Sequence, residues 1–398
     1  MTNNTTDTVR TEMIHKITAV YLDKITAVVD GEKKFHSFVE SMFSMQGNEF
    51  FNQLAELDKF EPYAQAIYDL WVQFYQWDAN PTPTFSVVKN KTAENQTFFS
   101  IISQDYNYIL RSLQYLFKSL NIKYINIMHP VIRVKRDDDG TLLELDELKN
   151  THRTDYHFES IVHCLILSPL STESLETLKN AVLDLFLELT TIYSGIKPAE
   201  RKMHLLSSVL YRNTEQGEFL NWVKNGFYYF YGYRYFNING SSYESGLSLD
   251  KKSVQGLFSI DKFNRHNDLQ PSFNDENFET SLLLAKSPLR SHINNGSRYD
   301  SIELPALNEN GEIKGLYQFI GSFTPDFFSA SPSVVPIARK KVKAVFNQFG
   351  FDEQWYNGKL LKTIIDSIPL DFFFQLDATT LTEICQRVMK NQKAVSFY

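Results

Sequence analysis

Residues 97–134 read TFFSIISQDYNYILRSLQYLFKSLNIKYINIMHPVIRV, and this stretch decides the fold of the first half of the chain. Thr97–Ile102 is β-branched and aromatic, which is typical of a strand. Apolar residues then recur at three- and four-residue steps from Tyr108 to Leu120, after a helix start expected near Gln104. Residues 124–134 predict a second strand that continues past a His-Pro step.

A third strand and a second helix complete this pattern. Residues 158–167 predict the strand, and a helix beginning near Ser171 buries Leu178, Val182 and Phe186. The order strand, helix, strand, strand, helix predicts a ferredoxin-like unit over Phe98–Leu189, an antiparallel sheet with both helices on one face. Regulatory modules of the ACT type use this plan, although a fold alone does not give a function.

The rest of the chain also reads as α+β. Helical periodicity precedes the first strand, and strands predicted at 227–238, 282–285, 299–304 and 316–323 indicate a second, mostly antiparallel sheet. Residues 250–280 are polar and predict a long loop. We therefore expect four parts: a helical segment (1–80), an ACT-like unit (84–195), a second α+β unit (196–330), and helices with a final strand (331–398).

Residues 227–236 are unusually aromatic, and Gly232 interrupts them. Strict alternation along a strand would place Tyr228, Phe230 and Phe236 on one face and the odd-numbered aromatic residues on the other. A base-stacking platform uses such residues, but a core strand packed on 317–323 or on the helix around Trp222 is favoured. The chain is acidic, with a formal net charge of -7, and this disfavours nucleic-acid binding.

Composition limits the compartment and the redox chemistry. The two cysteines, Cys164 and Cys385, lie far apart in apolar runs and are expected to be reduced core residues. Residues 1–6 are polar and do not resemble a signal peptide. With no long apolar stretch either, the sequence predicts a soluble, cytoplasmic protein that does not bind a membrane.

Several motifs could indicate a cofactor, metal or catalytic site, but each favours a structural role. No glycine-rich dinucleotide or phosphate fingerprint follows a predicted strand, so we expect no catalytic residues and no cofactor site here. No two of the histidines His129, His152, His157 and His163 have helical metal-ligand spacing, so we expect no metal site. Residues 137–140 resemble the start of a calcium loop, but a hairpin turn is favoured. Cys164 and His163 are sequence neighbours on a strand and so point to opposite faces, which disfavours a nucleophile–base pair.

Five blocks, in order, resemble the N-terminal region of the large bacterial NAD-specific glutamate dehydrogenases. The blocks lie between residues 98 and 398. The first 80 residues of this chain resemble that family least. The blocks are Ile101–Asp105 with the Met128–Gly140 segment; Phe158–His163; Glu218–Trp222 with Tyr231–Arg234; Phe319–Thr324 with Pro336–Val342; and Phe349–Asp352 with Gly358-Lys359, Ile368–Asp371 and Phe374-Gln375.

The resemblance implies a regulatory and oligomer-building region with ACT-like and PAS-like units. In that family the catalytic domain, which uses NAD to convert L-glutamate to 2-oxoglutarate and ammonia, lies downstream. A further ACT-like unit would begin near residues 394–398, which read as the opening of a strand, and truncation of a longer protein is the expectation. The alternative is a stand-alone amino-acid-sensing or scaffold protein.

The resemblance also implies a site for a small amino-acid effector. ACT-like units hold such ligands at the strand-to-helix turn, which here places candidates at Ser103, Gln104, Asp105 and Asn107. A simple helix cap is the competing interpretation. The family's helix opens with a doubled acidic pair and carries a later acid, whereas this chain has Gln104-Asp105 and Arg111.

Overall fold

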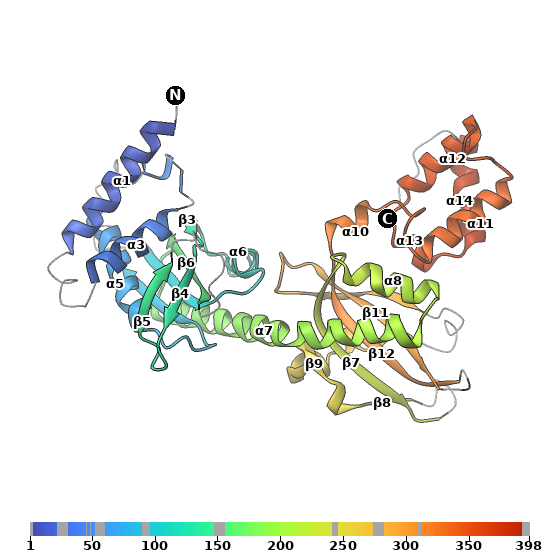
Figure 1. Cartoon of the computed structure of the whole chain (residues 1–398), viewed down its shortest axis with the longest axis horizontal. Coiled ribbons are helices and arrows are strands. Elements are labelled where there is room, and N and C mark those ends of the chain that lie inside the picture. Colours follow the sequence, from blue (N-terminus) through green and yellow to red (C-terminus); the bar gives the residue numbers. More distant parts are fainter. Residues whose placement is uncertain are drawn as a thin grey trace. The chain divides into compact units, whose positions relative to one another are not determined.

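The computed structural model describes residues 3–21, 31–44, 46–47, 49–51, 60–89, 96–146, 156–240, 246–273, 282–308, 310 and 312–391 (Figure 1). The chain divides into two compact units. The first comprises residues 1–190 with 292–296, and the second comprises 191–291 with 297–398. The strand expected at 394–398 lies outside the described residues. In the described part of the chain, no helix has the length and apolar character needed to cross a bilayer.

The first unit contains an antiparallel sheet. Its elements after the N-terminal helices are β1 (Thr84–Lys89), β2 (Thr97–Gln104), α6 (Ile109–Ser119), β3 (Tyr124–Met128), β4 (Val131–Arg136), β5 (Leu142–Asp146), β6 (His157–Ile166) and α7 (Thr172–Leu205). The strand order is β1-β2-β6-β4-β5, and β3 also pairs with β6. All of these pairs are antiparallel.

The α+β class and the ferredoxin-like order are confirmed, with two differences. A ferredoxin-like sheet has its last strand at the position beside β2. Here β1 takes that position, although it comes before the unit in sequence. The predicted helix start near Gln104 is wrong. Gln104 is the last residue of β2, and α6 begins at Ile109 after Tyr108 adopts a left-handed φ of 73°.

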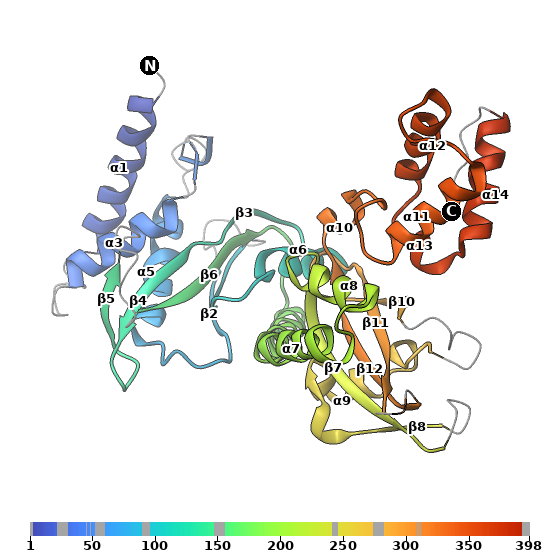
Figure 2. The ribbon, with the colours of Figure 1, turned by 45° about the vertical axis from the view of Figure 1, so that its right-hand side comes forward.

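Helices cover both faces of this sheet. The N-terminal helices α1 (Asn3–Val20), α3 (Gly31–Phe43) and α5 (Phe60–Gln76) share one core with Phe98 and Ile102 of β2. The helices α6 and α7 lie on the opposite side (Figures 1 and 2), where Phe117 meets Phe99 edge to face at 6.4 Å between centroids. The two predicted helices thus share a face, and the N-terminal helical layer fills the other.

A buried ion pair joins the helical layer to the sheet. The Arg136 guanidinium donates to both Glu159 carboxylate oxygens at 2.7 and 2.8 Å, and both side chains are almost completely buried. It also donates to the carbonyl of Phe74 at the end of α5, at 2.8 Å. Residues 137–140 form the β4–β5 hairpin turn, with Asp137 accepting from the amide of Thr141, so the hairpin interpretation is confirmed.

His163 is buried in the same core. Its ring stacks on Phe98 at 5.9 Å and meets Tyr63 edge to face at 5.5 Å, and Nδ1 lies 2.7 Å from the Ser100 hydroxyl. Nε2 has no hydrogen-bond partner among the described residues, and burial lowers the pKa of His163 to about 4. Burial raises the pKa of the neighbouring Cys164 thiol to about 12. Both are inert core groups.

The second unit contains the second antiparallel sheet, in the order β10-β11-β12-β7-β8, with β9 also paired to β7. Its strands are β7 (Tyr228–Ile238), β8 (Leu247–Leu249), β9 (Gln255–Gly256), β10 (Leu283–Arg290), β11 (Arg298–Leu307) and β12 (Ile313–Phe323). Its helices are the end of α7, η1 (Leu206–Leu210), α8 (Glu215–Lys224), η3 (Lys251–Ser253), η4 (Leu257–Ser259), α9 (Asp261–Asn264), η5 (Asn267–Leu269), α10 (Pro325–Ser329), α11 (Ala338–Phe349), α12 (Tyr356–Ser367), α13 (Phe372–Gln375) and α14 (Ala378–Asn391).

Residues 250–273 are more ordered than the predicted long loop. They contain β9 and several short helices, packed beside the sheet by Phe258, Phe263 and Leu269. Residues 274–281 lie outside the described part of the chain.

The aromatic strand β7 is central, as predicted, and pairs with β12 along its length. Trp222 stacks on Phe227 at 4.0 Å, which confirms the predicted contact with the helix around Trp222. The predicted strict alternation is wrong. Gly321 pairs with Phe230 and Ile320 with Gly232, so Tyr231 is one extra residue, a β-bulge. Tyr228, Phe230 and Tyr233 therefore share one core, while Phe236 faces the other side.

Phe230→Ala should lower the free energy of unfolding of the second unit by about 3–5 kcal/mol. Phe230 is 5% exposed and packs edge to face on Tyr228 and Phe319, so its removal leaves a cavity. Urea melts followed by circular dichroism measure this, with Phe328→Ala, at a 45% exposed position, as the control. Equal midpoints for the two variants would show that Phe230 is not a core residue.

The first unit should lose stability as the pH falls from 6.5 towards 4. In that window His163 is protonated in the unfolded chain but not in the folded chain. The free energy of unfolding therefore falls by up to about 1 kcal/mol for each pH unit. His163→Gln should flatten this dependence, whereas His204→Gln, at an exposed position, should not. Urea titrations read by pyridyl-disulfide labelling of buried Cys164 give the stability at each pH. Parallel pH profiles for the parent and His163→Gln chains would contradict the assignment.

Candidate functional site

The residues predicted to bind an effector lie at the end of β2 and in the turn that follows. Ser103 is buried and pairs with Ser160. Gln104 donates to the Ala79 carbonyl and accepts from Tyr106, both at 3.1 Å.

The other two candidates lie in the turn itself. Asp105 is partly buried, which raises the pKa of its carboxyl, and Asn107 is exposed. The structure brings the four candidates to one strand end. It places them before α6, which starts at Ile109 without a side-chain cap. Ligand binding there stays a prediction.

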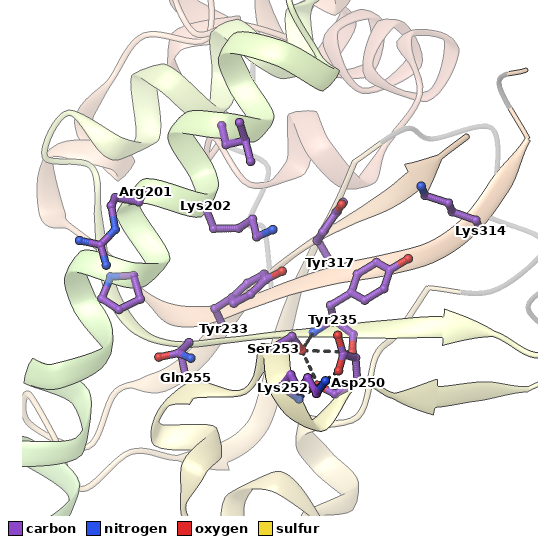
Figure 3. A pocket seen from close by; sticks show the side chains of 12 residues that line it. Arg201, Lys202, Tyr233, Tyr235, Asp250, Lys252, Ser253, Gln255, Lys314 and Tyr317 are labelled. Carbon is purple, nitrogen blue, oxygen red and sulfur yellow. Dashed lines mark hydrogen bonds between the residues drawn. The ribbon is translucent and has the colours of Figure 1, made fainter. Parts of the chain in front are cut away.

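A larger candidate site lies wholly in the second unit. It is an open groove of about 640 Å³ between the end of α7 and the strands β7 and β12, closed at one edge by residues 250–255 (Figure 3). We call it the tyrosine-cation groove. Its lining is Pro198, Arg201, Lys202, Leu205, Tyr233, Tyr235, Asp250, Lys252, Ser253, Gln255, Lys314 and Tyr317.

Three tyrosines form its floor. Tyr235 and Tyr317 are cross-strand partners with ring centroids 4.9 Å apart, and Tyr233 stacks on Tyr317 at 6.4 Å. Gly315 leaves room for this arrangement, because a Cβ there would come within 2.1 Å of the Tyr235 hydroxyl. Burial raises the pKa of all three phenols, so each stays protonated and can donate a hydrogen bond.

Cations surround this floor. Lys202 reaches from α7 over the rings of Tyr233 and Tyr317, with Nζ 5.7 and 5.5 Å from their centroids (Figure 3). Arg201, Lys252 and Lys314 are exposed at other points of the lining. Among the described residues of the lining, four are cations and one, Asp250, is an acid. This composition suits an anion.

The edge formed by residues 250–255 is fixed to the sheet. Ser253 Oγ accepts from the backbone amide of Tyr235 at 2.8 Å and donates to the carbonyl of Asp250 at 2.6 Å. The Asp250 carboxylate accepts from the amide of Lys252 at 3.0 Å, which caps the short helix η3. This carboxylate is therefore held in a structural role.

On the opposite face of the sheet, Arg234 is buried. Its guanidinium donates to Gln318 at 2.7 Å, to Asn264 at 2.8 and 2.9 Å and to the Leu269 carbonyl, and it stacks over Phe258 at 3.9 Å. Burial lowers the pKa of Arg234 to about 9, so it remains charged at neutral pH.

Gln318 connects Arg234 to a second buried charge, Glu303, to which it donates at 3.2 Å. Glu303 also accepts from the amides of Ser272 and Phe273, and burial raises its pKa. A cavity of about 70 Å³ adjoins Glu303, much smaller than the tyrosine-cation groove. Together the two charges hold residues 264–273 against the sheet.

Arg201, Lys202, Lys252 and Lys314 were not identified from the sequence. The available signal was weak: adjacent cations one turn after Pro198, and aromatic residues in two strands far apart in sequence. Among the described residues, no three His, Cys, Asp or Glu side chains gather as metal ligands would. His129 lies 2.6 Å from the Ser160 hydroxyl and His157 2.7 Å from Glu159; His152 lies outside the described residues.

The fold and the sequence comparisons agree on the class of protein. Residues 55–182, which include the sheet of the first unit, match the glutamate dehydrogenase ACT1 domain. Residues 335–394, which include α11 to α14, match helical motif 1 of glutamate dehydrogenase. The chain is thus an α+β protein, and the sheet of its first unit lies in a segment similar to the ACT1 domain of glutamate dehydrogenase.

Two curated relatives are both named NAD-specific glutamate dehydrogenase. The protein of Halomonas elongata is 23% identical over 302 residues, covering 72% of this chain and 19% of the relative. That of Pseudomonas aeruginosa is 21% identical over 321 residues, covering 77% of this chain and 20% of the relative. The resemblance to this family is confirmed, and the chain spans about a fifth of the length of these relatives.

Arg234→Met should destabilise the second unit by about 3–5 kcal/mol, because it leaves the buried Glu303 without its counter-charge. Arg212→Met, at an exposed position, is the matched control and should change stability by about 0.5 kcal/mol or less. Urea titrations of both variants make the comparison. If Arg234→Met were as stable as the control, the buried network would not hold the 264–273 segment.

Proposed function

We propose that this chain is a regulatory and oligomer-building region of an NAD-specific glutamate dehydrogenase. The parent enzyme would oxidatively deaminate L-glutamate to 2-oxoglutarate and ammonia with NAD, in the cytoplasm. The observation that carries the proposal is the ACT1 match over residues 55–182, on a segment that folds with the ferredoxin-like strand order.

The proposed partners are the rest of the enzyme and further copies of the chain. In the first unit, β1 and β5 are the edge strands of the sheet, and edge strands are ready sites for pairing between chains. Leu143 of β5 is 40% exposed, which adds apolar area at that edge. These features support an oligomeric role.

The proposed effector of the ACT-like unit is a small amino acid at the β2–α6 turn. Ser103, Gln104, Asp105 and Asn107 lie there, and the partly buried Asp105 carboxylate offers a partner for an ammonium group. Gln104 would have to leave Ala79 and Tyr106 to take part. Calorimetry with a panel of amino acids tests this.

The purified chain should form no NADH from L-glutamate and NAD and should not bind NAD, because NAD chemistry is assigned to another part of the parent enzyme. The Halomonas elongata enzyme in the same assay is the positive control. Sedimentation of the chain over a range of concentrations should show self-association. Glutamate-dependent NADH formation by the chain would overturn the assignment of catalysis elsewhere, and a monomer at every concentration would overturn the oligomer-building role.

A further inference from the structure

The tyrosine-cation groove has the composition of a ligand site, although none of its residues was a sequence candidate. We propose that it binds a small organic anion carrying at least two negative charges, as carboxylate or phosphate groups. The groove's own residues support this binding. Only the further step, that the ligand regulates a dehydrogenase, rests on the proposed function.

The groove carries an excess of positive charge. Arg201, Lys202, Lys252 and Lys314 line it, and for none of the four is an ion pair found within the described ranges. Holding four like charges around one cavity costs free energy that a bound anion would recover. The carboxylate of Asp250, which also lines the groove, already accepts from the Lys252 amide.

The placement of the cations sets the ligand's charge. Arg201 and Lys202 come from α7, Lys252 from η3 and Lys314 from β12, so the cations of the lining come from three separate elements (Figure 3). A single carboxylate would satisfy one element and leave the others unpaired. Two or more anionic groups on one molecule can engage separate elements through charge-assisted hydrogen bonds.

The tyrosine floor indicates the size of the ligand and its further polar groups. The rings of Tyr235 and Tyr317 are partly exposed, and their protonated hydroxyls can donate to further oxygens. Lys202 is held over two rings, so its charge is positioned above the floor before any ligand arrives. A volume of about 640 Å³ is in the range typical of small-molecule pockets.

A nucleic-acid strand fits these observations less well. Strand binding needs a basic track that follows many phosphates, and the chain as a whole carries a net charge of -7. The excess of cations is local to the groove. The local excess favours a compact ligand.

Calorimetry on the whole chain tests the proposal with two anions, adenosine monophosphate and tricarballylate, and with adenosine as the neutral analogue. At least one anion should bind with a Kd of about 1 mM or tighter and should weaken as salt is raised. Binding of the phosphate alone or of the tricarboxylate alone identifies the ligand's chemistry. Adenosine binding as tightly as its monophosphate would overturn the proposal, as would no binding of either anion at about 10 mM.

Matched variants assign the binding to the groove. Lys202→Gln and Arg201→Gln should each raise the Kd by about tenfold, the effect of losing one charge-assisted hydrogen bond. Lys343→Gln removes one exposed charge from α11 and should leave the Kd unchanged. Thermal melts confirm that each variant is folded. An equal Kd for Lys202→Gln, Arg201→Gln and Lys343→Gln would place the anion elsewhere and overturn the assignment, while the proposed function would stand.

Discussion

One extra residue in β7 decides what each face of the second sheet presents. Because Tyr231 is the extra residue of the β-bulge opposite Ile320 and Gly321, the strand returns to register with Tyr233 and Tyr235 on the same face as Phe230. Without the bulge, the alternation would place Arg234 towards that core and would turn the tyrosines to the other side. The bulge therefore creates the floor of the tyrosine-cation groove and the buried cation behind it at once.

The two faces depend on each other through residues 250–273. On the face opposite the groove, Arg234 donates hydrogen bonds to Asn264 and Leu269, and Glu303 accepts one from the Ser272 amide. These bonds hold the end of the segment. On the groove side, Ser253 fixes the beginning of the segment to Tyr235. Between these two anchors, Gly232 lets β7 approach residue 255 closely, because a Cβ at Gly232 would meet the Gln255 carbonyl at 2.9 Å. The edge of the groove is thus positioned from the opposite side of the sheet.

The sequence predicted what is local and periodic, and missed what depends on distant pairing. The strand and helix order from 97 to 189 and the central aromatic strand follow from short-range patterns. The position of β1 does not, because β1 pairs with β2 at the place that the last strand of a ferredoxin-like sheet takes. The bulge at Tyr231 was invisible for a similar reason: alternation along one strand contains no information about its partner's register. The groove needed α7, β7 and β12 to be placed together, which no spacing in the sequence reveals.

The blocks that carry the resemblance to glutamate dehydrogenases build the scaffold. Arg136 and Glu159, from two of the blocks, form the buried pair that joins α5 to the first sheet. Arg234, from a third block, is buried on the face of the second sheet opposite the groove and donates to Gln318 there. All four of the groove's described cations, Arg201, Lys202, Lys252 and Lys314, lie outside the quoted blocks. A scaffold set by such motifs can hold different charges at its surface, because exposed side chains are not constrained by packing. What the groove binds is therefore decided by residues that the resemblance does not cover, and it has to be measured on this chain.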